Sequence, residues 1–119
     1  MEHSKEFEEL VEHAKKNVAE VSVTDTIKRL DNGAILIDVR EDNEWDKGHA
    51  KNAIHLGRGI IERDIVAKFP DKNAELILYC GGGFRSILSA ENLQKMGYRN
   101  VSSMAGGWRA WLDANVQTD

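Results

Sequence analysis

Two kinds of apolar pattern divide the chain into candidate helices and strands. Residues 5–18 place apolar side chains at spacings of three and four, which predicts an amphipathic helix. Glutamates precede lysines along this segment, an order that suits the helix dipole. We expect this helix to pack against the core or against a partner, through a face formed by Phe7, Leu10, Val11, Ala14 and Val18.

Further along the chain, short and nearly continuous apolar runs predict buried strands. These runs occupy residues 21–23, 34–39, 53–56, 75–79 and 101–104. Between them, Ser22 followed by Asp25 resembles a helix-capping signal, and the helix it opens should end at Asn32–Gly33. Further helices are expected at residues 60–69, 86–96 and 108–114. This alternation of strands and helices indicates an α/β fold whose parallel sheet is covered on both faces.

Composition narrows the class of protein. The 119 residues suit one domain, and contents of 41% hydrophobic and 30% charged residues are those of a globular protein. A net charge of −4, with no basic run longer than Lys15–Lys16, argues against nucleic-acid binding. The apolar runs are far shorter than the roughly 20 residues of a membrane span, and the charged N-terminus does not resemble a signal peptide. We expect a cytoplasmic protein without membrane partners.

The single cysteine, Cys80, stands where chemistry is expected. It follows a predicted strand and opens the segment Cys80-Gly81-Gly82-Gly83-Phe84-Arg85-Ser86, which leads into a predicted helix. In open α/β sheets, ligands bind beyond the carboxyl ends of the strands. Three glycines let the backbone turn its N–H groups inward to bind an anion, and the helix start adds further donors. Such surroundings favour a reactive thiolate.

Arg85 supports this interpretation. A cation is electrostatically misplaced at the start of a helix, and no carboxylate lies between Glu75 and Glu91 to offset it locally. We expect an anion in the loop, either the thiolate or a substrate group. A lone cysteine is often only a small buried apolar residue, and a glycine cluster is often only a turn. The combination of strand, cysteine, glycines, arginine and helix favours a catalytic role.

Three motifs resemble the rhodanese family of sulfurtransferases over roughly residues 20–113. The first is Asp38-Val39-Arg40, followed by Glu44-Trp45, Gly48-His49 and Ala53. The second is the six-residue loop from Cys80 to Arg85. The third is Gly106-Gly107 with Trp111 four residues on. On this resemblance, residues 20–119 form a rhodanese-like domain and residues 1–19 an additional N-terminal helix.

The resemblance implies both a fold and a reaction. The fold is a five-stranded parallel sheet with helices on both faces. In the reaction, Cys80 attacks a small anionic sulfur donor such as thiosulfate and holds a persulfide, which a thiol, a protein cysteine or cyanide then discharges. No cofactor is needed. The loop N–H groups from Gly81, Gly82, Gly83 and Phe84 to Ser86 would hold the persulfide anion, and Arg85 would attract the donor.

Several other candidate residues fit a structural role as well as a functional one. Asp38 interrupts an apolar run, which favours a buried carboxylate that pairs with Arg40 or orients the loop. Arg58 follows a strand end and could line the pocket mouth, where we also expect an exposed Phe84. A catalytic pair of Cys80 with His49 or His55 is not favoured, and the histidine spacing gives no metal site. Core packing is expected of Trp45, Trp108 and Trp111.

Three alternatives stay open at this point. Cysteine-dependent phosphatases and arsenate reductases use a similar loop with one more residue between cysteine and arginine, so the shorter loop here suits a smaller anion. A non-catalytic binding module of the same fold would typically lack the cysteine, which this chain retains. A persulfide relay between proteins would use the same Cys80 persulfide as a thiosulfate enzyme.

Overall fold

The computed structural model describes residues 3–119, which form six helices and five strands. The helices are α1 (Lys5–Lys15), α2 (Val23–Asp31), α3 (Asp42–Asp46), α4 (Ile61–Lys68), α5 (Arg85–Lys95) and α6 (Gly107–Asp113). The strands are β1 (Ala19–Val21), β2 (Ile35–Asp38), β3 (Ile54–His55), β4 (Leu76–Tyr79) and β5 (Val101–Met104). None of these helices is both long and apolar enough to cross a membrane.

The five strands form one parallel sheet in the order β1-β5-β4-β2-β3. Strand β4 lies at the centre, and all four of its residues are buried. A strand covered on both faces needs apolar side chains on both, which explains the unbroken run of Leu76–Tyr79. The predicted parallel α/β sheet is therefore confirmed, and the carboxyl ends of β2, β4 and β5 meet at one edge.

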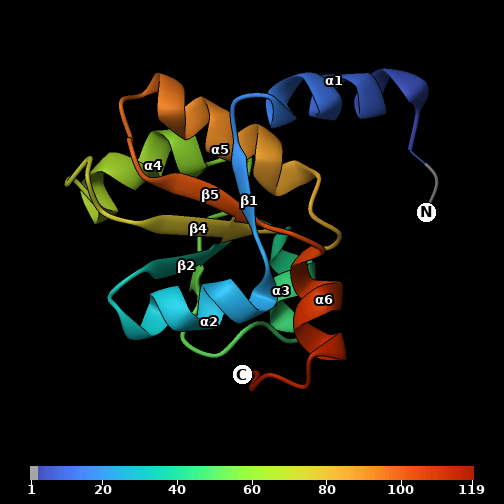
Figure 1. Cartoon of the computed structure of the whole chain (residues 1–119), viewed down its shortest axis with the longest axis vertical. Coiled ribbons are helices and arrows are strands. Elements are labelled where there is room, and N and C mark those ends of the chain that lie inside the picture. The colour runs from blue at the N-terminus through green and yellow to red at the C-terminus, as the bar shows by residue number, and fades with distance from the viewer. Residues whose placement is uncertain (1–2) are drawn as a thin grey trace.

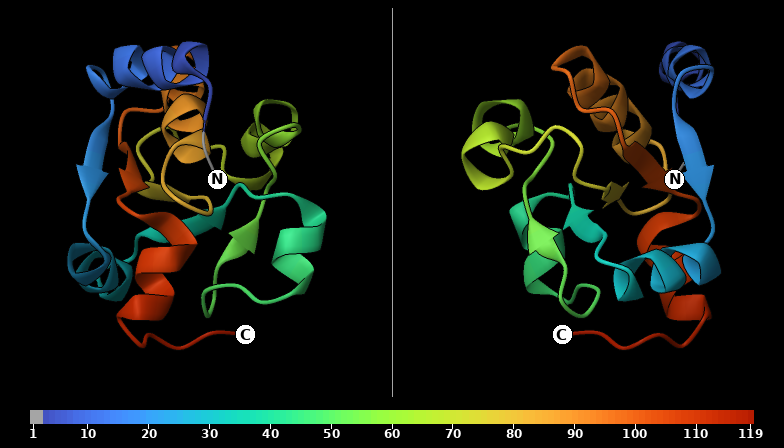
Figure 2. Two further views of the ribbon diagram at one scale, coloured as in Figure 1. Left: turned by 90° about the vertical axis from the view of Figure 1, so that its right-hand side faces the viewer. Right: turned by 60° about the vertical axis from the view of Figure 1, so that its left-hand side comes forward.

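Two helical layers cover the sheet, as Figure 1 shows. Helices α1, α4 and α5 lie on one face, with α1 packed across α5 (Figure 2). Helices α2, α3 and α6 lie on the other face. The buried apolar residues divide accordingly into a cluster that includes Val11, Ile65 and Leu93 and a second cluster that includes Leu36 and Trp111.

The structure corrects the sequence predictions at three places. The first strand is Ala19–Val21 rather than residues 21–23, because the Oγ of Ser22 accepts the Asp25 N–H at 3.0 Å and starts α2 at Val23. Helix α3 was not predicted, since five residues are too few to show an apolar period. Leu10 is 53% exposed, whereas Val11 and Ala14 on the same helix are buried.

The start of α6 lies directly against the cysteine loop. The N–H of Trp108 donates to the carbonyl of Cys80 at 2.7 Å, and the N–H of Arg109 donates to that of Gly81 at 3.2 Å. Gly107 adopts φ +54°, and a Cβ atom built there would overlap the carbonyl oxygen of Cys80. Only glycine allows this close approach of the two backbones.

We therefore expect Gly107→Ala to lower the free energy of unfolding by about 3 kcal/mol, because the substitution adds both backbone strain and a steric overlap. Gly59→Ala is the matched control, since a Cβ there meets nothing within 4 Å and its φ is not positive. Urea unfolding of both variants measures the difference. Equal stability of the two variants would show that the loop and α6 can separate without cost.

Candidate active site

The sulfur of Cys80 lies buried at the carboxyl end of β4 and faces the start of α5. The residue is 1% exposed. Its Sγ accepts the N–H of Gly83 at 3.2 Å and the N–H of Ser86 at 3.4 Å. Two backbone donors and the positive end of an eleven-residue helix therefore converge on one sulfur atom. This arrangement stabilises negative charge at that atom.

The loop around Cys80 leaves further donors available. The amides of Gly82, Phe84 and Arg85 donate to no backbone acceptor among residues 3–119. Of the three loop glycines, Gly83 alone has a positive φ, at +100°. Its backbone also passes close to that of Gly106, so a side chain at this position would crowd the third motif. The loop is thus a glycine-rich turn in which several N–H groups have no backbone acceptor within the part of the chain that the structure describes.

A buried hydroxyl chain lies beneath the sulfur. The Oγ of Ser86 is 3.5 Å from the Sγ of Cys80 and 2.7 Å from the Oγ of Ser103 on β5. Both serines have no exposed surface. The hydroxyl of Ser89, one turn further along α5, is buried without a hydrogen-bond partner among the described residues. Sequence reasoning missed Ser103 because it stands in an otherwise ordinary strand.

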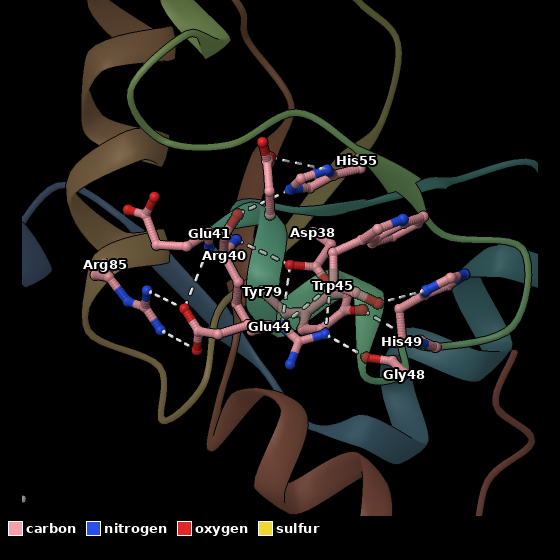
Figure 3. Close-up of polar contacts among 12 residues, drawn as sticks. Asp38, Arg40, Glu41, Glu44, Trp45, Gly48, His49, His55, Tyr79 and Arg85 are labelled. Carbon is pink, nitrogen blue, oxygen red and sulfur yellow. Dashed lines mark hydrogen bonds and ion pairs between the residues drawn. The ribbon is translucent and has the colours of Figure 1, made fainter.

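Arg85 is paired with a carboxylate that sequence spacing did not reveal. Its two terminal nitrogens donate to the two Glu44 oxygens at 2.8 and 3.0 Å (Figure 3). The sequence predicts the thiolate or a substrate group as the anion beside Arg85, whereas in the structure that anion is Glu44, which α3 brings across from 41 residues earlier. The hydrogen bonds from Arg85 hold the pKa of Glu44 below its ordinary 4.5, and the same pair raises the pKa of Arg85.

The expected pairing of Asp38 with Arg40 is present. The Asp38 carboxylate accepts the Arg40 main-chain N–H at 2.9 Å and its Nη2 at 2.8 Å, and both residues are buried. Arg40 also donates to the carbonyl of Gly48 at 2.7 Å and lies over the Trp108 ring. The pair connects the end of β2 to Gly48, later in the first motif, and to Trp108 of α6. It takes no part in lining the cleft at Cys80.

His49 and His55 are engaged with Trp45 rather than with Cys80. His49 and His55 both stack on Trp45, with ring centroids 3.4 and 4.8 Å away (Figure 3). Their ring nitrogens contact the carbonyls of Trp45 and Arg40 respectively. Trp111 is a buried core residue, whereas Trp45 and Trp108 are half-buried. Within residues 3–119, no group of three or more metal-ligating side chains could hold an ion.

A cleft of about 1140 Å³ opens above the sulfur. Arg58 and Arg109 are exposed at its lining, as expected for Arg58 from its place after a strand. Phe84 also lines it but is half-buried rather than exposed, because the rings of His3 and Phe7 lie against it. The cleft therefore combines a buried sulfur, two exposed cations and the rings of His3, Phe7 and Phe84.

Known proteins resemble this chain in sequence and in fold. The family model of the rhodanese-like domain matches residues 22–114. The chain belongs to the rhodanese-like family. The matched residues contain all three motifs identified in the sequence, including the cysteine loop.

Three relatives illustrate the similarity. The thiosulfate sulfurtransferase GlpE of Haemophilus influenzae is 31% identical over 84% of this chain and 93% of its own. YrkF of Bacillus subtilis, named as a sulfur carrier protein, is 30% identical over 84% of this chain, which spans 56% of that relative. The polysulfide-sulfur transferase homodimer of Wolinella succinogenes superposes with a TM-score of 0.80 at 25% identity, covering 96% of this chain and 87% of that one.

The Glu44–Arg85 pair makes a pH-dependent prediction. Because the folded-state pKa of Glu44 is lowered, its stabilisation is fully present above the ordinary glutamate pKa and is lost as pH falls through the folded value. We expect Glu44→Gln to lower the free energy of unfolding by about 1 kcal/mol at pH 7, since the pair is partly exposed. In urea unfolding, this difference should stay constant to pH 5 and shrink below pH 4. A difference that persists unchanged into acid would argue against an ionic contribution.

Proposed function

We propose that this chain is a sulfurtransferase that carries a sulfane sulfur on Cys80. The observation that carries the proposal is the convergence of the Gly83 and Ser86 N–H groups on a buried Sγ atom at the base of an open cleft. A thiolate held there is a nucleophile, and the persulfide it forms is an anion in the same field. The family membership supports the same chemistry.

The first half-reaction uses an anionic donor such as thiosulfate. The Cys80 thiolate attacks the outer sulfur, the sulfur–sulfur bond of the donor breaks, and sulfite leaves with the electron pair. Cys80 then holds the transferred sulfur as a persulfide. The amides of Gly81, Gly82, Phe84 and Arg85, which have no backbone acceptor among the described residues, are the donors available to the outer sulfur. Preorganised N–H groups of this kind stabilise charge without reorganisation.

The second half-reaction regenerates the enzyme. A thiolate or cyanide attacks the outer sulfur of the persulfide, the bond to the Cys80 sulfur breaks, and the thiolate is restored. Because Glu44 neutralises Arg85, the loop arginine acts mainly to position the loop. Long-range attraction of anionic donors falls instead to Arg58 and Arg109, which are exposed at the cleft and form no ion pair among residues 3–119.

A persulfide relay is the second candidate. The similarity to a protein named as a sulfur carrier favours it, and it shares the Cys80 persulfide with the first candidate. Phosphatase or arsenate reductase chemistry has less support, because a loop arginine bound by both oxygens of Glu44 is not free to clamp a tetrahedral oxyanion. Rates with thiosulfate and with a protein persulfide distinguish enzyme from relay.

Intact mass spectrometry of the reduced protein tests the proposed function. We expect the wild type to gain one sulfur atom from thiosulfate or polysulfide and to lose it to cyanide or a dithiol. Cys80→Ser should do neither, because a hydroxyl cannot form the persulfide. A wild-type protein that gains no sulfur from either donor would overturn the proposal and leave a binding module.

The hydroxyl of Ser86 should assist persulfide formation. We expect Ser86→Ala to slow the first half-reaction about fivefold, since one buried hydrogen bond to the sulfur is lost. Ser89→Ala removes an equally buried hydroxyl of α5 that has no partner in the described chain, so its rate should be that of the wild type. Rapid-quench mass measurement of the sulfur adduct gives both rates. Equal slowing in the two variants would indicate a packing effect rather than a contact with sulfur.

A further inference from the structure

The N-terminal segment forms one wall of the cleft above Cys80. His3, Phe7 and Phe84 line that cleft together. The ring centroid of His3 is 4.9 Å from those of Phe7 and Phe84, and Phe7 is 6.3 Å from Phe84. We call these three residues the aromatic wall. Two of the three come from outside the part of the chain that the family model matches, which begins at residue 22.

The fold fixes the position of this wall. The Oγ of Ser4 caps α1 by accepting the Phe7 N–H at 3.1 Å. One turn later, Val11 and Ala14 are each 1% exposed in the cluster that also contains Ile87 and Leu88 of α5. Phe7 and Phe84 both pack at the margin of that cluster. The helix is therefore anchored to the domain, and its first turn is held beside the cysteine loop.

The free charges of the cleft are unequal. Arg58 and Arg109 are exposed at the lining, and neither forms an ion pair within residues 3–119. Glu8 is the exposed carboxylate of the lining and is likewise unpaired there, whereas Glu44 is taken up by Arg85. Two cations against one anion favour a ligand that carries more carboxylates than ammonium groups.

The size of the cleft points to a ligand larger than thiosulfate. Its volume of about 1140 Å³ exceeds the roughly 300–1,000 Å³ of pockets that enclose drug-sized organic molecules. A small inorganic anion bound at the loop would fill only a fraction of that volume. An organic sulfur compound with an apolar stem and carboxylates could reach the aromatic wall and the two free arginines, which line the same cleft.

Resting on the proposed function, we propose that the N-terminal segment determines specificity for a low-molecular-weight carboxylated thiol. The aromatic wall contacts the apolar stem of this thiol, and Arg58 and Arg109 bind its carboxylates. In the transfer, the thiolate attacks the outer sulfur of the Cys80 persulfide, the bond between that sulfur and the Cys80 Sγ breaks, and the electron pair returns to Cys80. The products are the organic persulfide and the free enzyme thiolate, so no oxidant or reductant is consumed.

Discharge of a preloaded persulfide tests this proposal independently of the donor. The full chain is loaded with inorganic polysulfide, desalted, and mixed with either glutathione or 2-mercaptoethanol. Glutathione is a tripeptide thiol with two carboxylates, whereas 2-mercaptoethanol is small and uncharged. The loss of the extra sulfur mass over time gives a rate constant for each thiol, and their ratio for one protein cancels any change in the reactivity of the persulfide.

We expect Arg58→Gln and Arg109→Gln each to lower the glutathione rate about threefold to fivefold and to change the 2-mercaptoethanol rate less than twofold. His3→Ala and Phe7→Leu should lower the glutathione rate about threefold through lost ring contacts. Leu10→Ala and Arg63→Gln are the matched controls, because Leu10 is exposed on the same helix and Arg63 pairs with Asp64 outside the cleft. Their ratios should equal that of the wild type.

The outcomes separate the two proposals. If polysulfide loads no sulfur on Cys80, the proposed function and this inference both fail. If the persulfide forms and both thiols discharge it, but the four substitutions leave the ratio of rates unchanged, the proposed sulfurtransferase function stands. The proposed role of the aromatic wall and the two arginines in specificity is then refuted. Loss of both rates in Phe7→Leu alone would indicate damage to packing, and His3→Ala, at a residue that precedes α1 and lies outside the buried cluster, then decides the role of the aromatic wall.

Discussion

The candidate site depends on the close approach of two backbone segments, the cysteine loop and the start of α6. Trp108 and Arg109 donate their N–H groups to the carbonyls of Cys80 and Gly81, and Gly107 lies where a side chain would meet the Cys80 oxygen. These bonds turn the loop carbonyls toward α6. The N–H groups of the same two peptide units, those of Gly81 and Gly82, then point away from α6, since a peptide unit presents its N–H and C=O in opposite directions. The contact with α6 therefore helps to hold the cysteine loop in its present shape.

The parallel sheet explains why residues far apart in sequence meet at this loop. The carboxyl ends of β2, β4 and β5 lie side by side, so one edge receives Asp38 and Arg40, then Cys80, then Ser103 and the turn into α6. The buried Asp38–Arg40 pair holds the segment after β2 in one conformation through its bond to the Gly48 carbonyl. That segment carries α3, and α3 delivers Glu44 to Arg85. A buried ion pair adds little net stability, so its value here is conformational.

The sequence predicts well what depends on local pattern. The apolar run at residues 75–79, the glycine turn and the helix that follows place Cys80 at a strand end, and the structure has it there. The sequence does not predict what depends on contacts between distant elements. Arg85 looks uncompensated in the sequence because its partner comes from a five-residue helix too short to show a period. From the sequence Phe84 looks exposed, because the sequence does not reveal that the rings of His3 and Phe7 pack against it.

The pairing of Arg85 with Glu44 divides recognition between two parts of the cleft. With its guanidinium held by both carboxylate oxygens, the loop arginine contributes shape and rigidity, while backbone N–H groups provide the field at the sulfur. Backbone donors act on any sulfur anion and cannot distinguish one organic partner from another. On the proposed function, discrimination therefore falls to side chains at the rim, where Arg58, Arg109 and the aromatic wall stand. A reaction centre built from backbone donors beside a rim built from side chains would allow rim substitutions to alter the substrate without disturbing the loop on which the proposed chemistry depends.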